Sequence, residues 1–210
     1  FMSLKFEVNR HVLIPRPETE ILVEKIIEYV KENCTGIVNI LDIGTGSGCI
    51  SVSLAYYLPN SRITAVDISC EALEVAKRNA EIAGVENRIQ FLQSDLFSQL
   101  PQLQENIKFD IIVTNPPYIP SPDLTSLQLE VRGFEPLEAL DGGDDGLDFY
   151  RKIIKDSPCF LKPGGLLAFE VGYNQAQLVS DLMKDCYYGV EIIKDLSKID
   201  RVVMGKLKCM

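Results

Sequence analysis

The chain has 210 residues, of which 46% are hydrophobic and 24% are charged. This composition is typical of a globular domain and excludes a disordered or fibrous chain. No run approaches the roughly 18 apolar residues of a membrane span, and the first residues lack the pattern of a signal peptide, so we expect a cytoplasmic protein. The net charge of −9 disfavours sequence-independent binding to nucleic-acid phosphates.

The six cysteines contain no C-x-x-C pair, and His11 is the single histidine. A Cys/His zinc set therefore cannot be completed, and we expect no metal site. A Ser-His-Asp or Cys-His mechanism would have to rest on His11 alone. Hydrolase chemistry of that kind is disfavoured.

The chain begins with two short segments, 6–8 and 12–14, that alternate apolar and polar residues around Asn9-Arg10. The pattern predicts a small β-hairpin, which Pro15 and Pro17 end. We expect residues 1–17 to be the remnant of, or linker from, a preceding region. Residues 18–210 would then form the main domain.

From residue 37 onward, β-rich and helical segments alternate, which predicts an α/β fold with a mostly parallel seven-stranded sheet and helices on both faces. The predicted strands are 37–43, 62–68, 88–94, 109–114, 166–171, 190–195 and 201–206. The predicted helices are 18–32, 48–57, 70–83, 146–160 and 174–184. Only residues 196–200 separate the last two strands, so these should form an antiparallel hairpin at one edge.

A glycine-rich turn, Asp42-Ile43-Gly44-Thr45-Gly46-Ser47-Gly48, joins the first of these strands to a helix. Glycines at such a turn let the backbone approach a ligand closely. A tight turn without a ligand is the simpler alternative. A dinucleotide fingerprint would need a third glycine at position 49, where this chain has Cys49.

Two further acids follow the next strands: Asp67, and Asp95 beside Leu96. The carboxylate of Asp67 could accept both hydroxyls of a ribose, and Asp95 could accept from an adenine amino group with Leu96 as an apolar contact. Each acid alone could equally be a helix cap or a solvated strand end. Together with Asp42 and the glycine turn, they resemble the Rossmann-like methyltransferases that use S-adenosyl-L-methionine.

The fourth predicted strand runs directly into Asn115-Pro116-Pro117-Tyr118. Two prolines stiffen the turn and leave the Asn115 side chain and the Pro116 carbonyl as acceptors. A planar NH₂ group needs two such acceptors, and the Tyr118 ring could cover its face. The turn therefore predicts a holder for an amide or an exocyclic amine, and the plain alternative is a rigid turn.

Three longer motifs distinguish among enzymes with this tetrapeptide: 14–20 (IPRPETE), 115–120 (NPPYIP) and 139–150 (ALDGGDDGLDFY). With 131–136 (VRGFEP), 170–172 (EVG) and 200–203 (DRVV), they resemble the HemK/PrmC family of protein-glutamine methyltransferases over essentially the whole chain. That family methylates the glutamine of the Gly-Gly-Gln motif in peptide-chain release factors. The resemblance also implies a helical domain ahead of the N-terminal segment, so we expect this sequence to be a catalytic portion.

The resemblance implies a role for individual residues. Asn115, Pro116, Pro117 and Tyr118 would hold the glutamine, with Asn115, Pro116 and Tyr118 as the catalytic group. The cofactor would lie against Asp42, Ile43, Gly44, Thr45, Gly46, Asp67, Asp95, Leu96 and Asn115. Arg16, Pro17, Glu18 and Thr19 would line the substrate side, although Arg16 and Glu18 could instead serve helix-start electrostatics. Leu96 departs from family members that have an aromatic residue there.

Acidic residues crowd the segment after the tetrapeptide: Glu130, Glu135, Glu138, Asp141, Asp144, Asp145 and Asp148, with Arg132 the only basic residue between 119 and 150. This segment could be a solvated loop, or it could repel nucleic acid and attract a basic loop of a protein substrate. We expect release factors as partners, no direct nucleic acid and a monomer. The alternatives are a nucleic-acid exocyclic-amine methyltransferase, or a scaffold without turnover.

Overall fold

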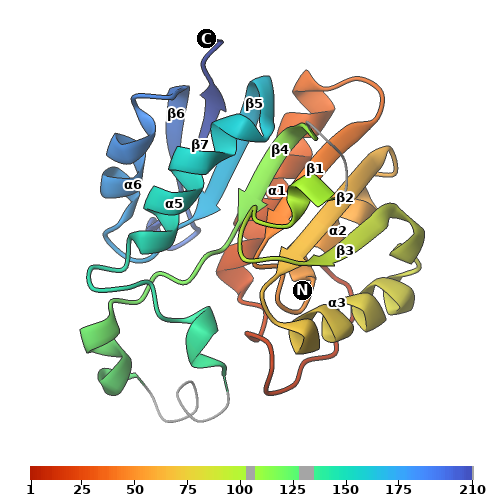
Figure 1. The fold of residues 1–210 in the computed structure, drawn as a ribbon, viewed down its shortest axis with the longest axis horizontal. Helices are drawn as coiled ribbons and strands as arrows, with labels where there is room; N and C mark the ends of the chain where they lie inside the picture. The colour runs from red at the N-terminus through yellow and green to blue at the C-terminus, as the bar shows by residue number, and fades with distance from the viewer. Residues whose placement is uncertain (103–106, 128–134, 210) are drawn as a thin grey trace.

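The computed structural model describes residues 1–102, 107–127 and 135–209. Its centre is a seven-stranded sheet of order β3-β2-β1-β4-β5-β7-β6 (Figure 1). The strands are β1 (Val38–Ile43), β2 (Ser61–Asp67), β3 (Ile89–Gln93), β4 (Phe109–Thr114), β5 (Leu161–Glu170), β6 (Tyr187–Lys194) and β7 (Asp200–Leu207). The predicted strands are thus confirmed, with ends that differ by at most five residues.

The first five strands of the chain pair in parallel, and β7 is antiparallel to both β5 and β6. The predicted C-terminal hairpin is therefore confirmed. Because β1 to β5 are parallel, their carboxyl ends meet at one edge of the sheet, where ligands bind in open α/β folds. Across the three described stretches, the structure contains no helix that is long and apolar enough to cross a membrane.

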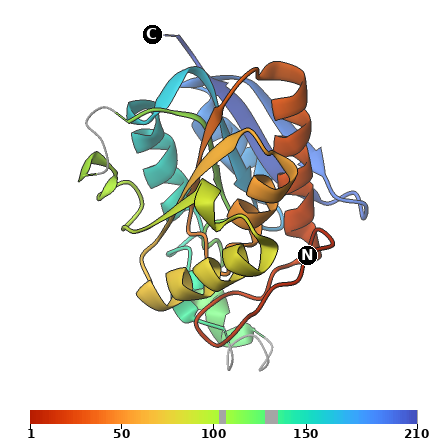
Figure 2. The ribbon, with the colours of Figure 1, turned by 90° about the vertical axis from the view of Figure 1, so that its right-hand side faces the viewer.

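Helices cover the two faces of the sheet (Figures 1 and 2). One face packs against α1 (Pro17–Asn33), α2 (Cys49–Tyr57) and α3 (Cys70–Ala83), and the other packs against α5 (Asp148–Asp156) and α6 (Ala176–Met183). Side chains of β5 alternate between the two cores: Leu166 and Ala168 lie on the α1 side, whereas Phe169 lies on the α5 side. Two hydrophobic cores therefore fix the strand ends that carry the site.

Local signals explain where several elements end. The Ser69 side chain accepts a hydrogen bond from the Ala72 amide at the start of α3, and Gly84 ends that helix with φ +68°. The predicted helix 146–160 is shorter than expected, because α5 ends at Asp156 and the short 3₁₀ helix Ser157–Cys159 follows. β5 begins at Leu161, five residues before the predicted start, because Leu161 pairs with Phe109 ahead of a register shift.

The N-terminal hairpin prediction is wrong. Residues 1–16 contain no strand, although a turn forms where the Val12 amide donates to the Asn9 carbonyl. Asn79 on α3 takes the place of a partner strand: its side chain accepts from the Glu7 amide and donates to the Glu7 carbonyl. Val12 packs with apolar residues of α3, so the segment runs along this helix (Figure 2). Packing on a helix outweighs the weak pairing of two three-residue strands.

Candidate active site

The glycine turn after β1 is tied to β2 by its backbone. The amides of Gly44 and Thr45 both donate to the Val66 carbonyl, each at 2.9 Å. Gly46 has φ +54°, and a Cβ there would meet no atom within 4 Å, so the turn leaves open space in front of it. Gly48 differs, because a Cβ there would lie 3.0 Å from Cβ of Ala76 and would separate α2 from α3. Gly46 thus faces the open site, whereas Gly48 packs one helix on another.

Asp42 is completely buried beneath this turn. Its Oδ2 accepts from the Thr45 hydroxyl at 2.6 Å, while its Oδ1 has no hydrogen-bond partner among the residues described. Burial raises the pKa of Asp42 to about 7, against the lowering effect of hydrogen bonds from Thr45 and Ser51. A buried acceptor that lacks a partner, at the base of a glycine turn, is suited to a ligand that brings an N–H donor or a positive charge.

The next two acids lie farther along the same edge. Asp67 ends β2, and its two oxygens accept from the amides of Gly46 (2.8 Å) and Ser69 (3.0 Å). Burial raises the pKa of Asp67, and these two bonds lower it. Asp95 follows β3 and is exposed, and the adjacent Leu96 adopts φ +48° with its side chain packed against the α5-side core. Since β3, β2 and β1 are adjacent, the two acids and the glycine turn form one row.

Ile43 does not present its side chain to this row, because it is buried in the core of the α5 side. Its carbonyl accepts from the Thr114 hydroxyl at 2.7 Å, which ties the end of β1 to the end of β4. The turn Asn115-Pro116-Pro117-Tyr118 begins at the next residue. The glycine turn and the Asn-Pro-Pro-Tyr turn are therefore neighbours at the same edge of the sheet.

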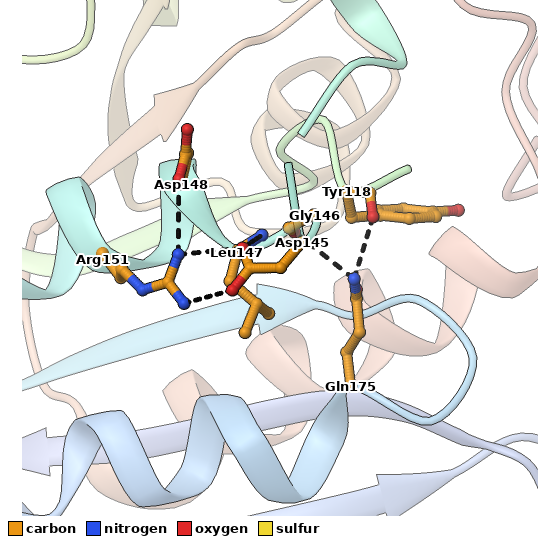
Figure 3. Close-up of polar contacts among 7 residues, drawn as sticks. All are labelled: Tyr118, Asp145, Gly146, Leu147, Asp148, Arg151 and Gln175. Atoms are coloured by element: carbon orange, nitrogen blue, oxygen red, sulfur yellow. Dashed lines mark hydrogen bonds and ion pairs between the residues drawn. The ribbon is translucent and has the colours of Figure 1, made fainter. Parts of the chain in front are cut away.

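Long-range contacts surround Tyr118 (Figure 3). Gln175, at the start of α6, donates from Nε2 to the Tyr118 carbonyl (2.9 Å) and to the Gly146 carbonyl (3.3 Å), while its Oε1 accepts from the Gly172 amide. A Cβ on Gly172 would lie 2.8 Å from the Tyr118 ring. Burial, followed by the charge of Glu170, raises the pKa of Tyr118 to about 12, so its phenol is neutral at pH 7.

The start of α1 reaches the same turn. Thr19 is buried, and its hydroxyl oxygen accepts from Asn115 Nδ2 at 3.4 Å. Arg16 donates from one nitrogen to both carboxylate oxygens of Glu135, at 2.7 and 2.9 Å. The charges of Arg16 and Glu18 shift the pKa of Tyr118 in opposite directions, which places both near it. The structure thus brings Thr19 to the turn, while Arg16 and Glu18 lie beside it at the start of α1.

The acidic segment is largely committed to its own structure. Asp141 accepts from the Ser121 hydroxyl (2.6 Å) and the Gly143 amide, and Asp145 and Asp148 both pair with Arg151 (Figure 3). The carboxylate of Glu135 forms an ion pair with Arg16. Glu138 and Asp144 are exposed. Glu130 and Arg132 lie outside the described residues. Much of this charge therefore holds the loop together rather than forming a free acidic surface.

Comparisons with known proteins agree with this geometry. A model described as "Methyltransferase domain" matches residues 36–204. The release factor glutamine methyltransferase of Moorella thermoacetica is 45% identical over 98% of this chain and 71% of its own length, and that of Clostridium acetobutylicum is 42% identical over the same shares. The chain belongs to the release factor glutamine methyltransferase family. A methyltransferase from Pyrococcus furiosus shares the fold, with a TM-score of 0.68 at 19% identity over 99% of this chain and 90% of that one.

The row of residues along the edge fits S-adenosyl-L-methionine, the methyl donor of such methyltransferases. Asp42 Oδ1, a buried acceptor without a partner among the described residues, would suit its ammonium group, and the space in front of Gly46 would admit its chain. Asp67 would accept from ribose hydroxyls, and Asp95 and Leu96 would face adenine. Among the residues with described positions, no three His, Cys, Asp or Glu side chains gather as a metal site.

Two residues of this methyltransferase site were not assigned from the sequence. Gln175 lies in a predicted helix start, and a buried glutamine has no local signature, so nothing short of the fold identifies it. Glu170 belongs to the 170–172 motif, one of those that resemble the family's sequences. An acidic residue at the end of a buried strand is a signal from which a site residue could have been predicted. Its partners come from α1 and the end of β4, which only the fold brings together.

Proposed function

We propose that this chain transfers a methyl group from S-adenosyl-L-methionine to the side-chain amide nitrogen of the glutamine in the Gly-Gly-Gln motif of peptide-chain release factors. The observation that carries the proposal is the Asn115-Pro116-Pro117-Tyr118 turn, fixed beside the glycine turn by residues of three other elements. Membership of the release factor glutamine methyltransferase family supports the substrate.

The substrate's amide is a weak nucleophile, because its nitrogen shares a lone pair with the carbonyl group. The Asn115 side-chain oxygen and the Pro116 carbonyl accept the two N–H bonds, and this favours a nitrogen whose lone pair points out of the amide plane. The neutral Tyr118 ring covers one face of the amide. S-adenosyl-L-methionine, when bound, supplies a methyl group on a sulfonium leaving group. Orientation and fixed dipoles therefore supply the rate enhancement.

The nitrogen loses its proton after alkylation, when it is far more acidic than in the free amide. Asn115 and the Pro116 carbonyl hold the N–H bonds until that point, and the proton then passes to solvent water. No side chain has to remove a proton before methyl transfer.

Arg16 and Glu18 line the substrate side in this proposal. The Arg16–Glu135 pair joins the start of α1 to the loop after the turn, with the Glu135 side chain 3% and the Arg16 side chain 37% exposed. The exposed face of Arg16 can contact the release factor, while its buried partner fixes the direction of the guanidinium group. We propose that the chain acts as a monomer in the cytoplasm, where its substrate takes part in translation.

The test is mass spectrometry of a release factor incubated with this protein and S-adenosyl-L-methionine, with RNA and DNA substrates in parallel. We expect one added methyl group on the glutamine of the Gly-Gly-Gln motif. A release factor in which this glutamine is replaced by alanine is the control and should gain none. Methyl transfer to adenine or guanine, without transfer to the release factor, would replace the proposal with a nucleic-acid methyltransferase.

A further inference from the structure

Glu170 is a buried carboxylate that the proposed mechanism does not use. It is the last residue of β5, which pairs in parallel with β4 so that Phe169 lies opposite Thr114. Glu170 therefore lies beside Asn115, the first residue of the turn. Its side chain is almost completely buried, and Oε2 has no hydrogen-bond partner among the residues described. A buried acidic oxygen without a partner is costly, so its presence calls for a function.

Two hydrogen-bonding side chains face this carboxyl group. Thr19 and Asn115 both lower the pKa of Glu170 by hydrogen bonding, against burial, the larger effect, which raises it to about 7. Thr19 and Asn115 also contact each other through Asn115 Nδ2. The register of β4 and β5 places Glu170 beside Asn115, and Asn115 contacts Thr19. The three residues therefore form one cluster at the ends of β5 and β4 and the first turn of α1.

The chemistry of the three groups decides how the Asn115 amide is turned. An ionised carboxylate only accepts hydrogen bonds, so it pairs with the NH₂ end of an asparagine and repels the oxygen end. Among the described residues, Asn115 Nδ2 donates within this cluster, and no donor is bonded to Oδ1. We propose that Glu170 is a positioning residue that, with Thr19, holds the Asn115 side chain with its nitrogen toward β5 and its oxygen toward the substrate amide. This inference rests on the proposed function.

The orientation matters because the two ends of the amide have opposite effects on the substrate. With Oδ1 toward the substrate, Asn115 accepts an N–H bond; with Nδ2 there, it would present a donor to a donor. A protonated Glu170, or a glutamine in its place, offers both a donor and an acceptor and no longer selects one orientation. The carboxyl group therefore has to be ionised for the turn to work.

Turnover should accordingly rise with pH as Glu170 loses its proton. The other groups that face Glu170 are Glu18 on α1, Arg201 on β7, Tyr118 after β4, Tyr150 on α5 and Cys49 on α2. Burial raises the pKa of Tyr118 and Cys49 to about 12 and raises that of Tyr150, so these three titrate at higher pH. Asp42, whose pKa is also about 7, belongs to the cofactor side and remains in a Glu170 variant.

The first experiment is a double-mutant cycle on kcat at saturating cofactor. Glu170→Gln should lower kcat by about 10-fold and flatten its rise near pH 7, while cofactor affinity stays unchanged. In an Asn115→Ala background the same change should cost nothing further, since no amide remains to be oriented. If the double variant instead loses kcat by the product of the two single losses, the proposal is overturned. Glu191→Gln, an exposed glutamate on β6, is the matched control.

Two substitutions at Thr19 separate the effect of its hydroxyl group from that of its shape. Thr19→Ser keeps the hydroxyl group and should retain most of the turnover, whereas Thr19→Val keeps the shape without the hydroxyl and should lower kcat several-fold. Equal losses in the two variants would show that packing alone matters at this position and would overturn the part assigned to Thr19.

Nuclear magnetic resonance tests the orientation without substrate or turnover. The ¹⁵N–¹H signals of the Asn115 side-chain amide, assigned by their absence in Asn115→Ala, should shift as pH rises through 7 in the native chain and stay fixed in Glu170→Gln. Signals that titrate identically in both would overturn the inference. This result is independent of the release factor, so an inactive native chain with titrating Asn115 signals would count against the proposed function alone.

Discussion

The glycine turn after β1 and the Asn-Pro-Pro-Tyr turn after β4 are neighbours, yet they are built in different ways. In the first, Asp42 is held by Thr45, three residues away, and Gly46 is held by Asp67, 21 residues away. In the second, Asn115 contacts Thr19, 96 residues away, and Tyr118 is held by Gln175, 57 residues away. The proposed cofactor side is mostly local in sequence, whereas the proposed substrate side is assembled by the fold.

This difference predicts which property each region controls. A local turn tied to β2 can hold its ligand without contributions from the α6 end of the molecule. A turn clamped from α1 and α6 depends on the packing of both faces of the sheet. Changes at the second turn should therefore affect turnover more than cofactor affinity, and changes at the first should do the reverse.

The largest effect is expected for Asn115→Ala. It removes an acceptor that is most useful in the transition state, so kcat should fall about 10²- to 10³-fold. Cofactor affinity, measured by isothermal titration calorimetry, should stay within about twofold of the native value. Asn87→Ala, at an exposed position, is the control. A matching loss of cofactor affinity would contradict the division between the two turns.

A smaller and opposite effect is expected for Asp67→Ala. The change removes the acceptor for the Gly46 amide and for the ribose hydroxyls, so the Kd for S-adenosyl-L-methionine should rise about 10- to 100-fold. At saturating cofactor, kcat should stay within a few-fold of the native value. Glu74→Ala, an exposed acid on α3, should leave both constants unchanged. An unaltered Kd would remove Asp67 from the cofactor site.

Gln175→Ala tests the hydrogen bond from Gln175 to the Tyr118 carbonyl. The carbonyls of Tyr118 and Gly146 lose a donor and the Gly172 amide loses an acceptor, so the free energy of unfolding should fall by about 1–3 kcal/mol and kcat by roughly 10-fold. Chemical denaturation and steady-state kinetics measure the two effects. The matched control is Gln177→Ala, exposed on the same helix. A loss of cofactor affinity alone would show that α6 supports the other turn.

A separate effect concerns pH and the stability of the cofactor-free chain. Burial raises the pKa of Asp42 and of Glu170 to about 7 in the folded state, whereas both ionise near pH 4 when unfolded. Between these values the folded chain binds more protons, so stability should fall as pH rises from about 4 to 7 and level off above. Melting temperatures from pH 5 to 8 test this. The fall should shrink in Asp42→Asn or Glu170→Gln, and an unchanged slope would show that neither acid causes it.

Local patterns in the sequence determined much of this protein. The alternation of β-rich and helical segments placed the seven strands, Ser69 and Gly84 set the ends of α3, and short spacing identified the C-terminal hairpin. The glycine turn with Asp42 and the Asn-Pro-Pro-Tyr turn were also identifiable, because each needs particular residue types at fixed spacing. These features depend on backbone geometry and turn chemistry within a few residues.

The tertiary structure decided the rest. It replaced the predicted hairpin with a segment on α3, since the Asn79 side chain supplies the hydrogen bonds that a strand partner would have provided to Glu7. It also brought Thr19, Glu170 and Gln175 to one turn from three distant elements. Such contacts depend on how two hydrophobic cores fix helix and strand ends in space. Because these residues are far apart in the chain, no local sequence pattern indicates that they are in contact.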